Sequence, residues 1–262
     1  MRHPEHDRLR DEIISWYRTS APSIGCYIER RRFGFYRRST TDPDSARLIV
    51  EGATPDDAAA MLSDAADYFG DREINIWIDD HETDAALGPA LVNAGCIRDH
   101  PTIYLAHTGP IPRVSLRTGI SIAEVTATTL SEFVDVKLKG FANSEDEPAP
   151  HRVVEETAVR AAESNGGARH FIARVNGEPA AILGYYEGDN RLIFNLATRV
   201  AMRKQGLARI LLCGAIADAN QLGCRSVMIN TDPDDTPINW YRRLGFDDEI
   251  YWVRSYTYRR ES

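Results

Sequence analysis

The stretch from Leu196 to Ala208 reads L-A-T-R-V-A-M-R-K-Q-G-L-A and decides the fold of this 262-residue chain. An apolar run of strand length, residues 191–198, leads into it, and apolar residues at helical spacing follow over residues 206–219. The order is strand, glycine turn, helix. Because Gly206 and Ala208 are small, a ligand can approach the backbone closely, and the first N–H groups of the helix lack partners within it. Such a turn suits phosphate oxygens.

Positive charge gathers at the start of this helix. Arg199, Arg203, Lys204 and Arg209 surround it, although the helix dipole disfavours a cation there by ~0.3–1 kcal/mol. A bound anion would reverse that unfavourable contribution. The alternative is a solvated helix end that tolerates these four side chains and binds nothing.

A second motif follows one helix and one strand later. Residues 241–246 read Y-R-R-L-G-F. Their helix is marked by Thr236 as the expected N-cap, by Pro237 at the first helical position and by Gly245 just beyond its end.

Together, the two motifs resemble the GNAT superfamily of N-acyltransferases. Residues 203–208, R-K-Q-G-L-A, match its R/Q-x-x-G-x-G/A signature, and residues 241–246 match Y-x-x-x-G-F. The resemblance covers residues 113–262. Many members carry an Asn about seven residues before the tyrosine, where this chain has Asp234, so contacts on the adenine side of the cofactor are expected to differ.

The resemblance implies an acyl-coenzyme A site and assigns roles to its residues. Tyr241 would face the sulfur and protonate or stabilise the departing thiolate; the alternative is an aromatic core residue. Main-chain groups of Leu196 and Thr198 would pair with the pantetheine arm and the thioester carbonyl, and backbone amides of residues 205–209 would hold the pyrophosphate. The residues expected to bind acetyl-CoA (coenzyme A) are Leu196, Thr198, Arg203, Lys204, Gln205, Gly206, Leu207, Ala208 and Arg209.

Prolines and a glycine divide the chain at residues 108–112, T-G-P-I-P, where every periodic pattern breaks. We expect an N-terminal module at 1–108 and a catalytic acyltransferase module at 113–262. The expected fold class is α/β of the mixed α+β kind. Each module would be a mixed, mostly antiparallel sheet flanked by helices.

The two modules repeat one order of elements. The first copy has a strand at 73–79, a helix at 83–94 that we expect to break near Gly88-Pro89, and a strand at 102–106. The same order recurs over residues 226–258, which indicates an internal duplication.

The first copy lacks the chemistry of the second. It has Leu91 where the second copy has Tyr241, and Asp56 and Asp57 at a helix start already complement the dipole and would repel a pyrophosphate. We therefore expect residues 1–107 to be a degenerate module that serves structure or substrate selection.

An acidic loop at residues 143–148 lies where this superfamily usually builds its acceptor pocket. Its three carboxylates would attract an amine, or they form a solvated charged loop. A protonated alkylamine needs a base; Glu145 and Glu187 are the candidates, and neither is specified by spacing. The remaining elements expected are a strand at 120–125, helices at 128–139 and 151–165, and strands at 169–175 and 179–187 joined by an Asn176-Gly177 hairpin turn.

Residues 26–38, C-Y-I-E-R-R-R-F-G-F-Y-R-R, interleave arginine with aromatic residues. This composition occurs in some single-strand nucleic-acid platforms. We favour a two-stranded ribbon around Gly34, with its aromatic rings in the core and its arginines in water or paired with acidic residues.

Composition excludes several classes of function. A net charge of −8 argues against general affinity for nucleic acid or anionic membranes. No apolar run approaches the ~18 residues of a spanning helix, and residues 1–7 lack the apolar core of a signal peptide, so a cytoplasmic location is expected. Scattered cysteines without a C-x-x-C pair predict reduced thiols, with no metal site and no disulfide.

The sequence therefore predicts an N-acyltransferase that transfers an acetyl group from acetyl-CoA to a primary amine by direct attack in a ternary complex. The acceptor would be a small molecule or a peptide, without nucleic-acid or membrane partners. The alternative is an acyl-CoA-binding or sensing protein without productive transfer. No motif specifies the acceptor, the acyl chain length, the general base or the oligomeric state.

Overall fold

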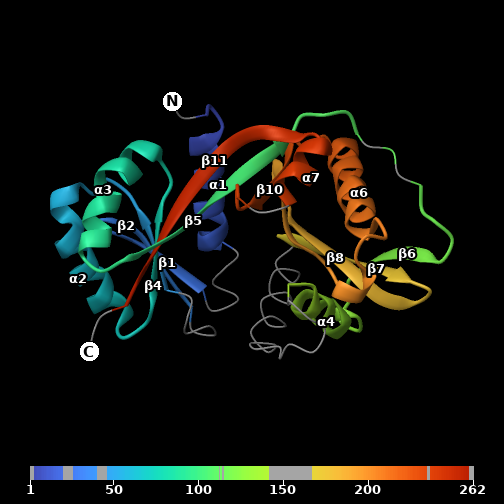
Figure 1. Cartoon of the computed structure of the whole chain (residues 1–262), viewed down its shortest axis with the longest axis horizontal. Coiled ribbons are helices and arrows are strands. Elements are labelled where there is room, and N and C mark those ends of the chain that lie inside the picture. The colour runs from blue at the N-terminus through green and yellow to red at the C-terminus, as the bar shows by residue number, and fades with distance from the viewer. Residues whose placement is uncertain are drawn as a thin grey trace. The chain divides into compact units, whose positions relative to one another are not determined.

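The computed structural model describes residues 3–19, 26–39, 46–111, 113, 115–141, 167–234 and 237–259. The chain has a mixed α+β fold with mostly antiparallel strands flanked by helices (Figure 1). It forms two compact units. Unit 1 comprises Met1–Leu105, Thr231–Ile238 and Glu249–Ser262, and unit 2 comprises Ala106–Asn230 and Asn239–Asp248. The module bounds expected from the sequence, 1–108 and 113–262, depend on the sequence repeat. They stay a prediction.

The sheet of unit 1 includes a strand from the far end of the sequence. Its strands β3 and β4 are parallel, whereas β1 with β2, β2 with β3, and β4 with β11 are antiparallel. The register of β4 and β11 runs from Ile78 opposite Arg254 to Ile74 opposite Tyr258. The strands are β1 (Cys26–Arg31), β2 (Gly34–Ser39), β3 (Ala46–Val50), β4 (Ile74–Ile78), β5 (Ile97–His107) and β11 (Phe246–Tyr258).

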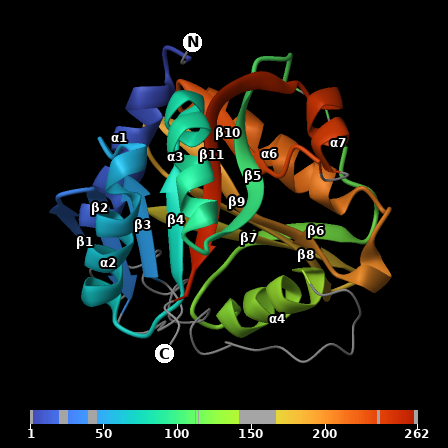
Figure 2. The same cartoon turned by 60° about the vertical axis from the view of Figure 1, so that its left-hand side comes forward.

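Helices cover both faces of this sheet. Alternate residues of a strand point to opposite faces, so Leu48 packs with α2 and α3, whereas Ile49 packs with Ile14 of α1. Figure 2 shows α2 and α3 together on one face. The helices of unit 1 are α1 (His6–Thr19), the short 3-10 turn η2 (Pro55–Asp57), α2 (Ala58–Phe69) and α3 (His81–Asn93).

The expected break at Gly88-Pro89 is wrong, because α3 continues through both residues. Pro89 lies on the exposed side of the helix, where water can reach the carbonyl that loses its hydrogen bond to the proline position. Gly88 faces the sheet, where a Cβ atom would collide with the hydroxyl of Tyr256. Both residues therefore fit a continuous helix.

The strands of unit 2 have helices on opposite faces. Strands β9 and β10 are parallel, and β6 to β9 are successively antiparallel. Ile172 and Ile182 pack with α4, whereas their neighbours Phe171 and Leu183 face α6. The elements are β6 (Ile120–Glu124), α4 (Leu130–Phe141), β7 (Ala168–Val175), β8 (Glu178–Tyr186), β9 (Asn190–Thr198), η3 (Val200–Met202), α6 (Leu207–Gln221), β10 (Ser226–Thr231) and α7 (Pro237–Arg243).

Most predicted elements occur with ends within two residues of expectation, while β5 and β11 are longer. The hairpin turn at Asn176 and Gly177 has φ of 50° and 88°, as a type I′ turn requires. The predicted helix 151–165, the loop 143–148 and the N-cap Thr236 lie outside the described residues.

The ribbon predicted for residues 26–38 is confirmed as β1 and β2, with Gly34 opposite Arg31. Phe33, Phe35 and Tyr36 are buried. The arginines pair with acidic side chains of unit 1: Arg30 with Glu51, Arg31 with Asp64 at 3.0 Å and Arg32 with Asp57 at 3.4 Å. This segment is a structural ribbon whose cations already have partners.

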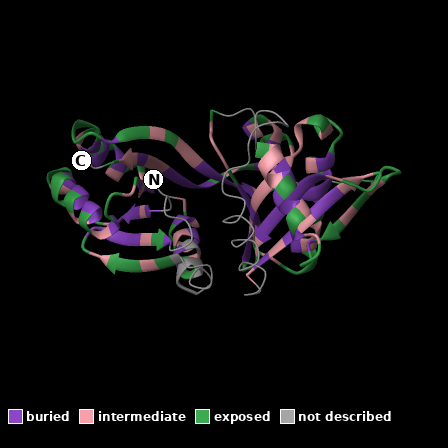
Figure 3. Ribbon diagram, turned by 90° about the horizontal axis from the view of Figure 1, so that it is seen from below, coloured by how far each residue is buried: buried purple, intermediate pink, exposed green. Residues whose placement is uncertain are grey.

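Buried residues concentrate in the strands and on the inner helix faces (Figure 3). Cys96, Cys213 and Cys224 are free thiols, and burial raises the pKa of Cys96 to about 11. Among the helices that the structure describes, none has the length and apolar character needed to cross a membrane.

The helix start of the first repeat is closed by its own carboxylate. The side chain of Asp57 accepts hydrogen bonds from the backbone N–H of Thr54 at 3.1 Å and from its hydroxyl at 2.7 Å. Leu91 is fully buried in the core of unit 1. Leu91 therefore serves the core, and Asp57 places negative charge at the helix start.

Candidate functional site

The parallel strands β9 and β10 of unit 2 separate partway along their length. Their pairing ends at Ile193 opposite Ile229, although β9 continues to Thr198. On its other edge β9 stays paired with β8 up to Thr198, past an irregularity between Ile182 and Gly184. Among the residues that the structure describes, no strand therefore pairs with this edge at the end of β9.

Main-chain groups of β9 point towards that edge. The N–H of Arg199 donates to the carbonyl of Ala180 in β8 at 3.0 Å. Because direction alternates along a strand, the main chain of Thr198 faces away from β8. Leu196 follows Asn195, whose positive φ of 52° marks the local irregularity of the strand. Two residues predicted to hold the pantetheine arm thus lie on the separated part of β9.

The turn after β9 leaves a helix start without a side-chain cap. Gly206 adopts a left-handed conformation with φ of 81° and ψ of 9°, and no side chain of the described residues caps α6. The first helical bond runs from the N–H of Ile210 to the carbonyl of Gly206. Lys204 also has positive φ, at 64°, which is uncommon for a residue with a side chain. Successive backbone turns of this kind direct N–H groups into one concave site.

The other residues predicted for the turn differ in how far their side chains are exposed. Leu207 is buried and anchors the helix, and Ala208 is half-buried. Lys204, Gln205 and Arg209 are exposed beside the turn. The structure therefore brings the nine predicted cofactor residues together at one end of β9 and α6.

Arg203 contacts the protein itself. Its Nε donates to the carbonyl of Thr198 at 3.3 Å, and its Nη2 donates to the carbonyl of Gly140 at 3.0 Å. A Cβ atom at Gly140 would lie 2.8 Å from the Cβ of Ala197 and 3.2 Å from the nitrogen of Thr198. The end of α4 therefore packs directly on the end of β9, and Arg203 joins both.

Tyr241 lies on α7 with only 8% of its surface exposed. Its ring is 5.2 Å from that of Trp240 and 6.3 Å from that of Phe246. The turn that follows is fixed by Gly245, which has φ of 94° and lies against Gly109, where added Cβ atoms would come within 3.0 Å of the facing Cα. The phenol thus belongs to a packed aromatic group.

His107 is a neighbour that the sequence motifs did not reveal. Its ring contacts that of Phe246 at 5.1 Å, and Phe246 in turn contacts Tyr241. Burial lowers the pKa of His107 below its usual 6.5, opposed by a hydrogen bond with the backbone of Leu244 and by the charge of Asp247. His107 is the last residue of β5, so only the fold brings it to the second motif.

Of the two bases considered from the sequence, Glu187 does not lie at this site. Glu187 pairs with Arg191 at 2.9 Å beside the first residue of β9. Eight residue steps of a strand separate Asn190 from Thr198, which amounts to about 26 Å. Glu145 lies outside the described residues.

Comparisons with known proteins agree with this geometry. Residues 136–246 match the model of a family described as Acetyltransferase (GNAT) family. No curated protein matches the chain.

Solved structures share the fold over most of the chain. A GCN5-related N-acetyltransferase from Kribbella flavida is similar with a TM-score of 0.65 and 17% identity, over 95% of this chain and 94% of that one. A tandem GNAT protein from the clavulanic acid biosynthesis pathway gives 0.63 and 14%, over 88% and 81%. A functionally unknown conserved protein from Staphylococcus epidermidis gives 0.68 and 14%, over 84% and 88%. At these identities the likeness concerns the fold.

Proposed function

We propose that this chain, a tandem GNAT protein whose residues 136–246 carry the family's domain, transfers an acetyl group from acetyl-CoA to a primary amine. One observation carries the proposal. The pairing of β9 and β10 ends at Ile193 and Ile229, and the open edge of β9 leads directly into the helix start at Gly206.

The residues present fit an acyl-CoA. The left-handed Gly206 has no atom within 4 Å of the position of an added Cβ, so the backbone there is accessible to a pyrophosphate. Helix N–H groups and nearby cations favour an anion at this place. Acetyl-CoA would supply a thioester as the activated acyl group.

Separate parts of unit 2 would take separate roles. Main-chain groups of Leu196 and Thr198 would hold the pantetheine arm at the open edge of β9. Residues 203–209 would hold the diphosphate through their amides, with Lys204 and Arg209 adding positive charge. Tyr241 would act as the acid that donates to the departing sulfur, and its burial would favour this role by excluding competing water.

The acceptor would attack directly in a ternary complex. No nucleophile elbow or Cys-His pair in the sequence suggests a covalent acyl-enzyme. A net charge of −8 favours approach of a cationic amine. We propose a small-molecule or peptide amine as the acceptor class, with neither nucleic acid nor a membrane as partner.

The test is release of free thiol from acetyl-CoA across a panel of polyamines, aminoglycosides, amino acids and peptides. Turnover with an acceptor, reduced at least tenfold in kcat in Tyr241→Phe with unchanged acetyl-CoA affinity, supports the proposal. The matched control is Tyr258→Phe, a half-buried tyrosine of unit 1, which should retain full activity. A Tyr241→Phe enzyme with full kcat would contradict the role of the phenol.

A second candidate is an acyl-CoA-binding or sensing protein. The packing of Tyr241 between aromatic rings is also what a core residue would show. Tight binding of acetyl-CoA without turnover on any amine would favour the sensor. Absence of acetyl-CoA binding would contradict both candidates.

A further inference from the structure

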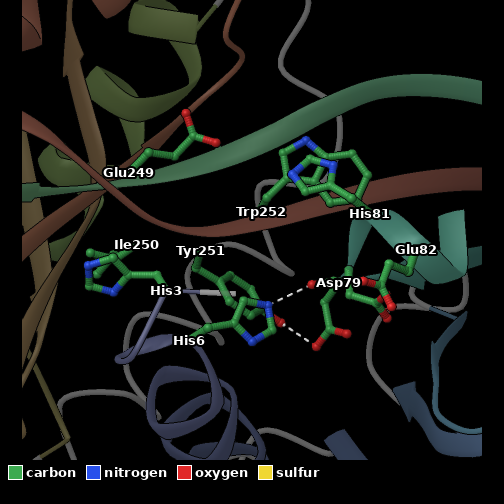
Figure 4. Close-up of a pocket in the computed structure, with 10 residues that line it drawn as sticks. His3, His6, Asp79, His81, Glu82, Glu249, Ile250, Tyr251 and Trp252 are labelled. Carbon is green, nitrogen blue, oxygen red and sulfur yellow. Dashed lines mark hydrogen bonds between the residues drawn. The ribbon is translucent and has the colours of Figure 1, made fainter. Parts of the chain in front are cut away.

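Unit 1 contains a cavity of about 510 Å³ that shares no residue with the predicted coenzyme A site. It is formed by the start of the chain, the turn between β4 and α3, and the beginning of the unit 1 part of β11 (Figure 4). Cavities of this size accommodate small organic molecules.

The floor of the cavity is buried and internally paired. Asp79 is 3% exposed; its Oδ2 accepts a hydrogen bond from the hydroxyl of Tyr251 at 2.9 Å and forms an ion pair with the Nε of Arg10 at 2.8 Å. His6 donates from Nε2 to the main-chain carbonyl of Asp79 at 2.6 Å, because a carbonyl can only accept. Arg10 also lies 3.6 Å from Glu51. Arg10, behind the floor, is therefore already shared between two carboxylates.

The rim of the cavity is acidic and exposed. Glu82 comes from the first turn of α3 and Glu249 from β11, and both are exposed. Within the residues that the structure describes, neither carboxylate has an ion-pair partner. Figure 4 shows Glu249 and Glu82 on different sides of the rings of Trp252 and His81, which are tilted by 35° with their centroids 4.1 Å apart.

An apolar wall joins floor and rim. Ile250 is 4% exposed and Trp252 8% exposed, and both line the cavity beside Glu249. A ligand with a hydrocarbon part would remove this surface from water. The combination of an apolar wall and an acidic mouth selects a ligand that has both an aliphatic part and positive charge.

The arrangement does not suit a metal ion. In the described part of the chain, the only three His, Cys, Asp or Glu side chains with ligand atoms within 4.8 Å of one another are His100, Asp232 and Asp234, which are outside this cavity. The acidic and histidine groups of the cavity are spread around its wall, as recognition of an extended organic cation requires.

We propose that this cavity is a binding site for an alkylammonium ligand, with the ammonium at the Glu82 and Glu249 rim and the hydrocarbon against Trp252 and Ile250. The site is independent of acyl transfer. Ligand binding at the cavity is measured without acetyl-CoA. Neither a positive nor a negative result therefore bears on the proposed transferase function.

The experiment is calorimetric titration of the full chain with 1,6-diaminohexane at pH 8. We expect saturable binding that weakens between 50 mM and 500 mM salt. The double variant Glu82→Gln/Glu249→Gln should bind about tenfold more weakly, since each lost pair at an exposed rim has a modest effect.

The matched control is Asp56→Asn/Asp71→Asn, which removes two exposed carboxylates of unit 1 outside the cavity. It should bind like the parent protein, and unchanged melting temperatures should show that both double variants are folded. Equal affinity of the rim variant and the control would overturn the proposal. Absence of diamine binding, or tighter binding of glutarate than of the diamine, would also overturn it.

Discussion

The side chain of Arg203 donates from Nη2 to the main-chain carbonyl of Gly140, 3.0 Å away and 63 residues earlier in the sequence. The same guanidinium donates from Nε to the carbonyl of Thr198. The first residue of the R-K-Q-G-L-A motif thus joins the end of α4 to the end of β9. A planar group with donors in a fixed fork is suited to two carbonyls at once.

Replacing Arg203 with alanine should loosen the open edge of β9. We expect acetyl-CoA to bind about tenfold more weakly, with a loss of about 1 kcal/mol in the free energy of unfolding. Arg203→Lys should recover only part of both, because an ammonium lacks the fork. Titration calorimetry and urea unfolding measure the two effects. Arg117→Ala, an exposed arginine of unit 2, serves as control; an equal loss of affinity there would refute a specific role for Arg203.

Substitutions at Gly206 test the left-handed backbone conformation alone, because an added Cβ atom causes no steric clash there. Its φ is 81°, and no atom lies within 4 Å of an added Cβ. Gly206→Val should weaken acetyl-CoA binding strongly, because a β-branched residue is strained at positive φ. Gly206→Asn should weaken it less, since Asn tolerates this conformation. Equal affinities of the two variants would show that the left-handed turn does not matter for binding.

The sequence was sufficient for the parts of the site that depend on local chemistry. Residues 203–208 specify a turn and a helix start through small residues and glycine, and Asn176-Gly177 specifies a hairpin. These features depend on neighbours within a few residues. The predicted strand, turn and helix over residues 191–219 therefore agree with β9, η3 and α6.

The features that the sequence did not predict depend on contacts between distant residues. The continuity of α3 depends on Tyr256, whose hydroxyl fills the space beside Gly88. The contact of Phe246 with His107 joins residues far apart in the sequence, and the Arg203 side chain is directed towards Gly140. Periodicity describes which face of an element is buried, but it contains no information on which element covers it.

Acid should destabilise the protein partly through His170. This histidine is 1% exposed between the rings of Phe133 and Phe194, and burial, followed by the charge of Lys137, lowers its pKa to about 4. An unfolded histidine has a pKa near 6.5. Between these values the unfolded state binds more protons, so this contribution to stability is complete above pH ~6.5 and is lost as pH falls towards 4.

Urea unfolding at pH 7, 6 and 5 measures the effect of His170. The free energy of unfolding of the parent should fall by up to about 1.4 kcal/mol per pH unit more than that of His170→Gln. His107, whose pKa is also lowered, is present in both proteins and cancels in the difference. Parallel pH profiles of parent and variant would contradict a buried neutral His170.

Asp79 forms a buried ion pair with Arg10 and a hydrogen bond with Tyr251. These two contacts should contribute unequally to the stability of unit 1. Asp79→Asn removes the carboxylate 2.8 Å from Arg10, whose side chain is 13% exposed, and leaves Glu51 at 3.6 Å as its remaining partner; breaking a buried pair costs up to about 3–5 kcal/mol. Tyr251→Phe removes one hydrogen bond and leaves the ion pair intact, so it should cost only about 1 kcal/mol. Because both variants act on the same carboxylate oxygen, their effects should not add, and the double variant should be more stable than the sum of the two losses predicts. Urea unfolding of the parent, both single variants and the double variant measures this coupling. A tyrosine variant that loses as much stability as the aspartate variant would show that the hydroxyl, and not the ion pair, holds this floor together.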